Sequence, residues 1–458
     1  MTDSFDVIVI GSGTGGYSAA LRAASLGKKV ALVERDQRLG GTCLLRGCIP
    51  TKALLQSASV LDQVERSEEW GISAKGEADW PKILEFQTKI VDKLVGGLTS
   101  LVKARKVEVV NGIGKLTAPG AVEVDGRKLE AKNVVVATGS YPKLLPGLEI
   151  SDRVITSDQA LNLDRIPNSA VVIGAGAVGL EFASLYRSFG AEVTLIEALD
   201  TLAPLEDADI SKEVARAFKK RGIAAHAGAK VQEVKKSKTG VTVSFETGGK
   251  TEKVDADICL VAVGRGPVTE GAGLEELGVE MERGYVKVNG QLQTNVQGVW
   301  AIGDVCTSPF QLAHVSMAEG VAVAERIDGQ EVPELDYAGV PRVTFSSPEI
   351  ASVGLTEAQA KERGHEVMVE KLNMQGIGKA NIVGEGGLCK VVAEKDGPVL
   401  GIHLIGPHVT DLVAEAMLIT NWEAMPEEVA ALIHPHPSLS EAIGEAHLAL
   451  AGKPLHTM

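Results

Sequence analysis

The feature that most constrains the fold is a glycine-rich pattern that occurs twice. One strand-like apolar run leads into GSGTGG at residues 11–16, and another leads into GAGAVG at residues 174–179. Each continues into a helical stretch and a second apolar run ending in an acid, Glu34 or Glu197, 23 residues after the first glycine (34 − 11 and 197 − 174). One copy would be weak evidence, but two copies in the same context predict two dinucleotide-binding folds.

Each glycine in such a turn has a separate purpose. The first permits a tight turn, the second lets a pyrophosphate approach the backbone, and the third lets helix and strand pack closely. The alternative is that these glycines only pack a helix on a strand. The predicted nucleotide-binding glycines are Gly11, Gly13 and Gly16 in the first repeat, and Gly174, Gly176 and Gly179 in the second.

The acids at the strand ends indicate which nucleotide is bound. Glu34 and Glu197 are each expected to accept hydrogen bonds from ribose hydroxyls. A 2′-phosphate would meet the Glu197 carboxylate at a like-charge penalty, and the next three residues, ALD, supply no arginine to receive it. The second fold is therefore expected to take NAD rather than NADP.

Later segments complete the predicted architecture. Buried-type strands at 133–140 and 258–266 belong to the two sheets, and a third at 298–305 is expected to return to the first sheet, making that domain discontinuous. From about Tyr337 the strand-like segments come first and the helical ones follow, as in an α+β unit. The predicted fold class is α/β, with two Rossmann-like domains and a C-terminal α+β domain. The predicted C-terminal strands are 342–345, 366–372, 387–393 and 399–405, and the predicted helices are 410–424, 426–433 and 437–450.

Composition excludes several classes of function. The net charge is −14 and aromatic residues make up 4%, so neither nucleic acid nor an anionic membrane surface is an expected partner. No apolar run approaches the roughly 18 residues that cross a bilayer, and the acidic start lacks the features of a signal peptide. Five cysteines, an odd number, argue against a secreted disulfide framework. The expected location is the cytoplasm.

Two of the cysteines differ in context from the other three. Cys259, Cys306 and Cys389 lie in apolar surroundings and are interpreted as core residues, whereas Cys43 and Cys48 share the segment GGTCLLRGCIPTK. In a regular helix their Cα atoms would lie roughly 8–9 Å apart, too far for a disulfide, so a bridge needs a distorted turn that glycine and proline permit. Such a strained bridge would be redox-active. The alternatives are two core cysteines or zinc, but no second ligand pair is present and no metal is predicted.

With these two cysteines set between two dinucleotide folds, the chain resembles the flavoprotein disulfide reductases over essentially its whole length. The ATG at 137–139 and TNVQGVWAIGD at 294–304 resemble the family's FAD motifs. The resemblance implies that Lys52 lies near the flavin and pairs with Glu181, the alternative being a surface ion pair. The implied FAD contacts beyond the first glycine turn are Thr42, Lys52, Gly114, Thr138, Gly139, Ser140, Asp304 and Ala313, and those for NAD beyond the second are Val231 and Gly264.

The segment HPHPSLSE at 434–441 contains the candidate general base. A histidine oriented by a carboxylate titrates near neutrality, as thiol chemistry requires. The segment resembles the family signature HxHPTxxE, which implies that His436 is the acid–base and Glu441 its partner, with Ser438 in place of threonine. The alternative is that Ser438 and Glu441 only form a capping box for the last helix.

The resemblance also implies a domain order and a reaction. The expected domains are FAD-binding (1–141), NAD-binding (142–268), central (269–337) and interface (338–458), in a homodimer whose His436 acts on the other subunit's disulfide. NAD preference and the absence of a second, C-terminal cysteine pair favour the members that oxidise dihydrolipoyl groups. A dihydrolipoyl dithiol would reduce the Cys43–Cys48 disulfide, and FAD would carry the electrons to NAD.

The expected partner is the lipoyl-bearing protein of a 2-oxoacid dehydrogenase or glycine cleavage complex. The alternatives are another NAD(P)H-dependent disulfide reductase of small disulfides, or a non-catalytic FAD/NAD-binding sensor. Two departures from the family pattern concern substrate choice: Leu45-Arg46 stands between the cysteines where Asn-Val is usual, and Gly266 stands where an arginine is usual.

Overall fold

The computed structural model describes residues 3–456, which divide into two compact units. Unit 1 contains residues 3–54, 82–143 and 265–337, and unit 2 contains residues 55–81, 144–264 and 338–456. The division into four domains at 141, 268 and 337 stays a prediction.

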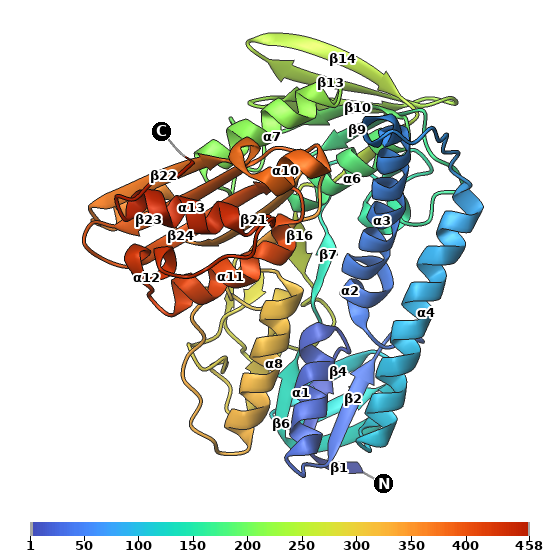
Figure 1. Ribbon diagram of the computed structural model, residues 1–458. Helices are drawn as coiled ribbons and strands as arrows, with labels where there is room; N and C mark the ends of the chain where they lie inside the picture. Colours follow the sequence, from blue (N-terminus) through green and yellow to red (C-terminus); the bar gives the residue numbers. More distant parts are fainter. Residues whose placement is uncertain (1–2, 457–458) are drawn as a thin grey trace. The chain divides into compact units, whose positions relative to one another are not determined.

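The first glycine repeat folds in unit 1 as strand β1 (Asp3–Ile10), helix α1 (Thr14–Ser25) and strand β2 (Val30–Glu34). β1 lies between β2 and β6 (Arg127–Val136) and is parallel to both (Figure 1). On the other side of β6, β19 (Val299–Ala301) pairs in parallel, which confirms that the third apolar run returns to the first sheet.

The remaining elements of unit 1 complete this sheet and cover it. The sheet order is β3-β2-β1-β6-β5-β4, with β19 paired to β6. Helix α3 (Cys48–Glu65) begins in unit 1 and α4 (Trp80–Ala104) ends in it. The other bounds are α2 (Gly41–Arg46), β3 (Glu108–Asn111), β4 (Gly114–Ala118), β5 (Ala121–Val124), β7 (Ser140–Pro142), β16 (Arg265–Pro267), β17 (Met281–Glu282), β18 (Tyr285–Val286), the 3₁₀ turn η2 (Gly303–Val305) and α8 (Ala313–Ile327).

Helices α1 and α8 pack against each other because two glycines leave room for it (Figure 1). A Cβ at Gly320 would lie 2.4 Å from the carbonyl oxygen of Gly15, and one at Gly15 would lie 3.0 Å from that of Ser316. At the far end of the contact, Arg22 Nε and Nη2 donate to Glu325 Oε1 at 2.8 and 2.6 Å. The helix that follows the first glycine turn is therefore held by residues about 300 positions later.

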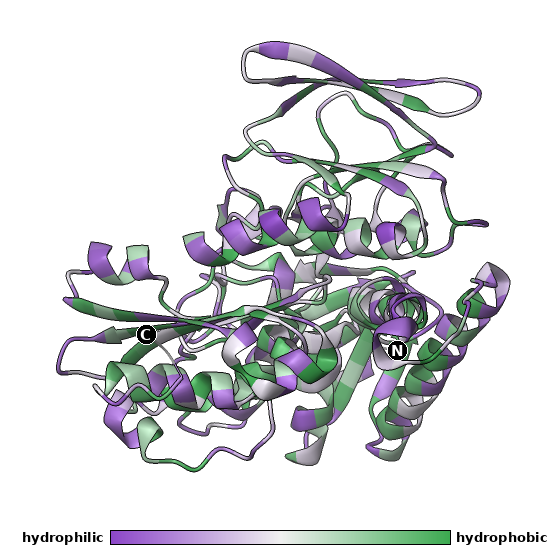
Figure 2. Cartoon of the chain, turned by 45° about the horizontal axis from the view of Figure 1, so that its top comes forward, coloured by the Kyte–Doolittle hydropathy of each residue, from purple (hydrophilic) through white to green (hydrophobic). Residues whose placement is uncertain are grey.

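The second glycine repeat folds in unit 2 as strand β9 (Ser169–Ile173), helix α6 (Ala177–Ser188) and strand β10 (Glu192–Ile196). The parallel sheet has the order β11-β10-β9-β15-β8. A separate antiparallel sheet has the order β12-β13-β14, and its outer strand β14 is exposed and largely hydrophilic (Figure 2). The other bounds are η1 (Ser67–Trp70), β8 (Val154–Ile155), α5 (Ser157–Ala160), α7 (Ala208–Lys220), β11 (Ala224–His226), β12 (Lys230–Lys236), β13 (Val241–Thr247), β14 (Lys250–Ala256) and β15 (Ile258–Val261).

The C-terminal part of unit 2 is α+β, as predicted. Its five strands form one antiparallel sheet in the order β20-β21-β24-β23-β22. The prediction that all strands precede the helices is wrong in detail, because it missed β21 and the short helices α9 and α10, which lie between strands. It also began the last helix at Pro437, whereas α13 begins at Glu441. The bounds are β20 (Arg342–Thr344), β21 (Glu349–Gly354), α9 (Glu357–Glu362), β22 (Val367–Asn373), η3 (Met374–Gly376), α10 (Gly378–Val383), β23 (Leu388–Glu394), β24 (Val399–Gly406), α11 (Val409–Asn421), α12 (Pro426–Ala430) and α13 (Glu441–Leu450).

Candidate functional site

The two glycine turns have the same backbone geometry. The first glycine of each has a positive φ, +103° and +101°. A Cβ on the third glycine would lie 1.8 Å from the carbonyl oxygen of the first, whereas a Cβ on the second would meet no atom within 4 Å. The open space at the second glycine, at the N-terminus of a helix, fits a pyrophosphate. These positions are Gly11, Gly13 and Gly16 in unit 1, and Gly174, Gly176 and Gly179 in unit 2.

The acid of each repeat is buried and bonded to its own glycine turn. Glu34 Oε2 accepts from Ser12 N at 2.8 Å, and Glu197 Oε2 accepts from Ala175 N at 2.6 Å. The other oxygen of each carboxylate accepts from the backbone N–H two residues on, in both cases at 2.8 Å. Both carboxylates are thus fixed beside the turn, where the geometry fits a nucleotide ribose. Their binding roles stay predictions.

The cysteine segment contains the distortion that a bridge requires. Helix α2 ends and α3 begins on either side of Gly47, whose φ and ψ of −146° and −115° interrupt the helix. This break brings the side chains of Cys43 and Cys48 into hydrogen-bond contact. The bond to Cys48 and then burial raise the pKa of the Cys43 thiol, while the positive charge of Lys52 acts in the opposite direction. Two sulfurs that touch beside a lysine can exchange between dithiol and disulfide.

The cysteine pair lies directly against the first glycine turn. Gly40 N donates to Ser12 O at 3.1 Å, and a Cβ at Gly41 would lie 2.6 Å from the Cα of Gly13. Tyr17, on the first turn of α1, lies close to both cysteines. Burial raises the pKa of Tyr17, and the charges of the two cysteines raise it further. The sequence analysis missed Tyr17, because spacing along α1 does not show which face meets the cysteines.

The expected flavin residues after β6 are joined by hydrogen bonds. Ser140 Oγ donates to Asp304 Oδ2 at 2.5 Å and accepts from Arg265 Nε at 2.7 Å. Beside Asp304, the buried carboxylate of Glu319 accepts from Gly303 N at 2.6 Å and from Tyr337 Oη at 2.9 Å. Burial raises the pKa of Glu319. Glu319 also escaped the sequence analysis, since it lies inside a helix with no motif around it.

The structure places the other expected contacts on several elements, and their roles stay predictions. Thr42 is in α2 and Ala313 begins α8, while Gly114 begins β4. Thr138 Oγ1 donates to the carbonyl of Val268 at 2.5 Å, and Gly139 has a φ of +75°. For the second nucleotide, Val231 is on β12, and Gly264, with a φ of +102°, follows β15.

Lys52 and Glu181 belong to different units. Glu181, on α6, is 4% exposed, and its Oε1 accepts from Phe345 N at 3.0 Å within unit 2. The Lys52–Glu181 pair therefore stays a prediction.

The candidate base and its carboxylate are paired in unit 2. His436 Nδ1 and Glu441 Oε1 are 2.7 Å apart, and Glu441 Oε2 accepts from Ser438 N at 2.9 Å. Burial alone would raise the pKa of Glu441, but the hydrogen bonds with His436 and Ser438 act against it, and the pKa is lowered. The His436 side chain remains 76% exposed. Helix α13 begins at Glu441, and its N-cap residue Ser440 makes no side-chain capping bond, whereas Glu441 bonds back to Ser438 N as in half of a capping box. The role of this pair as base and partner therefore stays a prediction beside the capping alternative.

A second histidine–glutamate pair lies two residues before the first. His434 Nε2 and Glu415 Oε1 are 2.7 Å apart, and this hydrogen bond raises the pKa of His434. The ring of His434 lies against α13 at Gly444, where a Cβ would be 2.5 Å from His434 Nδ1. Glu415 is on α11, and its separation from the HPHP segment explains why the sequence analysis missed it. The segment that carries His436 is thus anchored at both ends by carboxylates.

The two departures from the family pattern have local explanations. Gly266 pairs with Tyr141 across the β16–β7 ladder, and a Cβ at Gly266 would lie 2.8 Å from Cζ of the Tyr141 ring. Arg46 forms an ion pair with Asp36, two residues after Glu34. A larger side chain at 266 would displace Tyr141. The charge of Arg46 is paired with Asp36, just after the acid of the first repeat.

Over the described range 3–456, no helix has the length and apolarity needed to cross a membrane. In the same range, no group of three or more His, Cys, Asp or Glu residues is arranged to hold a metal ion.

Comparison with known proteins agrees with this geometry. The family described as pyridine nucleotide-disulphide oxidoreductase matches residues 5–320, and its dimerisation domain matches residues 340–447. A dihydrolipoyl dehydrogenase of Bacillus subtilis is 43% identical over 475 residues, covering 100% of both chains. One from Rhizobium etli is 40% identical over 483 residues, again covering 100% of both. The crystal structure of LpdA from Mycobacterium tuberculosis is similar with a TM-score of 0.89 and 28% identity, over 97% of this chain and 99% of that one.

Proposed function

The chain belongs to the pyridine nucleotide-disulphide oxidoreductase family, and we propose that it oxidises dihydrolipoyl groups carried by a partner protein. It is an NAD-dependent flavoprotein disulfide oxidoreductase of the dihydrolipoyl dehydrogenase type, and its cofactors are FAD and NAD. The match to the dimerisation domain indicates a homodimer. The lipoyl-bearing partner, the cytoplasmic location and the residue roles below are our proposals.

One observation carries the proposal: two cysteines in side-chain contact lie directly against a glycine turn built for a dinucleotide. FAD fits the first turn, with Glu34 at its ribose and Asp304 at its ribityl hydroxyls, and when bound it supplies two-electron transfer between the cysteine pair and NAD. NAD fits the second turn, with Glu197 at its ribose.

The protein's own residues account for the thiol chemistry. In the oxidised enzyme Cys43 and Cys48 share a disulfide. His436 Nε2 removes a proton from the substrate dithiol, and Glu441 stabilises the imidazolium that forms. The substrate thiolate attacks Cys43 Sγ, so the Cys43–Cys48 bond breaks and Cys48 leaves as a thiolate beside Lys52. The second substrate thiol then attacks the substrate sulfur of the mixed disulfide, so the bond to Cys43 breaks, the oxidised lipoyl ring closes, and Cys43 takes up the proton of this second thiol. His436 releases the first proton to solvent.

The position of His436 supports a site shared between subunits. Its side chain is largely exposed, and Leu432 and Ile433, directly before its segment, are 62% and 98% exposed although apolar. An apolar surface of this kind favours contact with a second copy. Two-fold symmetry then gives two equivalent sites, each with one chain's cysteines and the other chain's His436.

Turnover with two substrate pairs tests the function. Dihydrolipoamide with NAD should be turned over rapidly, whereas glutathione disulfide with NADPH should not. The reverse preference would indicate a different disulfide reductase, and no turnover of either by FAD-loaded protein would indicate a non-catalytic sensor.

A further inference from the structure

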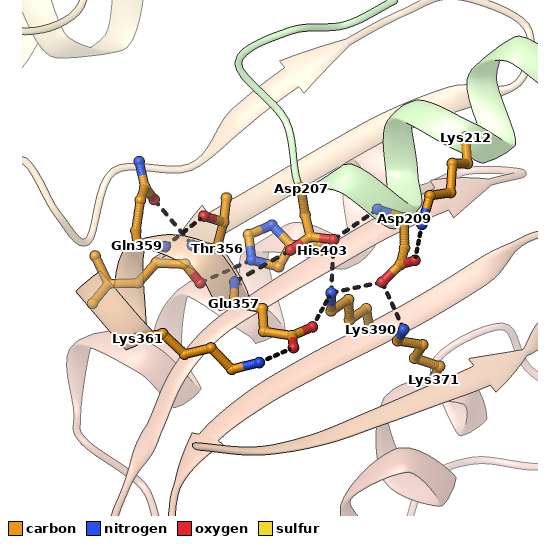
Figure 3. Close-up of polar contacts among 11 residues, drawn as sticks. Asp207, Asp209, Lys212, Thr356, Glu357, Gln359, Lys361, Lys371, Lys390 and His403 are labelled. Carbon is orange, nitrogen blue, oxygen red and sulfur yellow. Dashed lines mark hydrogen bonds and ion pairs between the residues drawn. The ribbon is translucent and has the colours of Figure 1, made fainter. Parts of the chain in front are cut away.

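Unit 2 contains a buried ion cluster that the proposed chemistry does not use. Lys390, on β23, is 1% exposed, and its ammonium donates to three carboxylates (Figure 3). The distances from Lys390 Nζ are 2.8 Å to Asp207 Oδ1, 2.7 Å to Asp209 Oδ2 and 2.7 Å to Glu357 Oε2. A lysine is almost never fully buried unless paired, and three acceptors use every N–H of the ammonium. The position of the ammonium is therefore tightly defined.

The cluster joins segments that are far apart in the chain. Asp207 and Asp209 lie at the start of α7, which follows the second glycine repeat, whereas Glu357 begins α9 and Lys390 is in the C-terminal sheet. Asp207 also accepts from two backbone N–H groups, that of Asp209 at 2.9 Å and that of Glu357 at 3.2 Å. Asp207 is thus the common point of both helix starts.

Surrounding charges complete the cluster. Lys371 and Lys212 donate to Asp209 at 2.8 and 3.2 Å, and Lys361 donates to Glu357 at 2.6 Å (Figure 3). The neighbouring His403 is fully buried and shares a hydrogen bond with the Leu355 carbonyl oxygen, and burial lowers its pKa. Four lysines thus surround three carboxylates, and only Lys390 among the four is buried.

A continuous set of hydrogen bonds connects this cluster to the second glycine turn. Asp207 holds the start of α7, where Ser211 Oγ donates to Ala203 O at 3.1 Å. Ala203 N in turn donates to Ala175 O, inside the glycine turn, at 3.1 Å. Ala175 N donates to Glu197 Oε2 at 2.6 Å. Ala203 is buried with a positive φ of +48°, a conformation that an alanine adopts only when its surroundings impose it.

Stability alone is a poor explanation for such a cluster. Desolvation of buried charges offsets most of their attraction, so apolar residues of similar volume are often equally stable. A buried cluster does specify one arrangement of the segments that supply it.

We propose that Lys390 is a positioning residue for NAD. By holding the start of α7, it fixes residues 199–206 against the second glycine turn and sets the orientation of Glu197 toward the nucleotide ribose. The inference rests on the proposed role of this turn, and it predicts that the C-terminal sheet controls NAD affinity through Lys390.

The test is Lys390→Met in the FAD-loaded protein. We expect the KM for NAD to rise roughly tenfold, while kcat at saturating NAD, the KM for dihydrolipoamide and the FAD content stay within about twofold. The dissociation constant of ADP-ribose, measured by calorimetry without turnover, should rise by a similar factor, because this probe contains the ribose that Glu197 would hold. The matched control is Lys395→Met, an exposed lysine just beyond β23 that pairs only at the surface with Glu366, and it should change none of these values.

Glu357→Gln is a second, milder variant, in case Lys390→Met does not fold. It removes one charge from the cluster but keeps an acceptor for Lys390. It should raise both constants in the same direction by a smaller factor. An unchanged ADP-ribose affinity in either folded variant overturns the proposal. So does a parallel loss of kcat, FAD content and NAD affinity, which would mark the cluster as structural only. If the unmodified protein binds ADP-ribose but does not oxidise dihydrolipoamide, the proposed function fails and the positioning role is still measured.

Discussion

After Glu34, the chain of unit 1 reaches Gly40 within six residues (40 − 34) and enters helix α2, which carries a cysteine against the glycine turn. After Glu197, the chain of unit 2 instead runs through residues 199–206 to α7, whose start is held by the buried Lys390. The turns themselves match in φ, in the close contact of the third glycine and in the bonding of the acid. The comparison teaches that both units share one backbone frame, whereas the segment after the acid differs: in unit 1 it leads to the cysteine pair, and in unit 2 to a helix tied to the C-terminal sheet.

The largest expected effect comes from removing the chemistry of the first repeat. Cys48→Ser should still bind FAD but lose dihydrolipoamide oxidation, and two-electron reduction should no longer give the long-wavelength absorbance of a thiolate next to flavin. Cys43→Ser should also be inactive but keep that absorbance, because the flavin-facing thiolate remains. Both variants should still oxidise NADH with an artificial acceptor, since the second turn is intact. If Cys43→Ser lost this absorbance and Cys48→Ser kept it, Cys43 rather than Cys48 would be the thiolate next to the flavin.

Neither repeat contains the base, so the next prediction concerns His436. His436→Gln should lower turnover by roughly 10²–10⁴-fold, the usual contribution of general acid–base catalysis. Mixing Cys43→Ser with His436→Gln subunits should restore activity in heterodimers, because one site then combines intact cysteines with an intact histidine. Verified heterodimers without activity would contradict a shared site.

Replacing each acid by glutamine tests whether the two turns bind different cofactors. Loss of charged hydrogen bonds costs about 1–3 kcal/mol, so Glu34→Gln should weaken FAD retention without changing the KM for NAD. Glu197→Gln should have the opposite pattern, and Glu197→Ala with Ala198→Arg should improve the use of NADP. Equal effects of the two Gln variants on both cofactors would break the comparison.

The smallest effect is a pH-dependent one, away from both turns. Because Glu415 raises the pKa of His434, the pair stabilises the fold fully below the unfolded-state histidine pKa of about 6.5, and this contribution disappears as pH rises through the higher folded-state value. Glu415→Gln should therefore lower Tm more at pH 5.5 than at pH 8.5 (both values approximate). His456→Ala, which removes an exposed histidine paired with Glu445, is the control. A Tm difference that grows with pH would contradict the assignment.

The sequence predicts the parts of this protein that depend on local chemistry. Glycine spacing identifies both turns, and the cysteine spacing requires a distorted turn, which Gly47 provides. Contacts made by residues without a motif were not predictable: Tyr17, Glu319, Glu415 and Lys390 reach their partners only through the fold. Strand β21 was missed because its sequence, EIASVG, is too short and mixed to stand out from a loop.

Unit 1 is assembled from three separate stretches of chain, and this has a consequence for the order of synthesis. Its sheet is missing strand β19, and helix α1 has no α8 to pack against, until residues 299–327 have left the ribosome. The parallel sheet of unit 2 has all its strands once residue 261 is made. At about 5–20 residues per second, the delay is several seconds. We therefore expect the nascent chain to complete the second nucleotide-binding sheet first and to capture flavin late, although the flavin turn is the earliest motif translated.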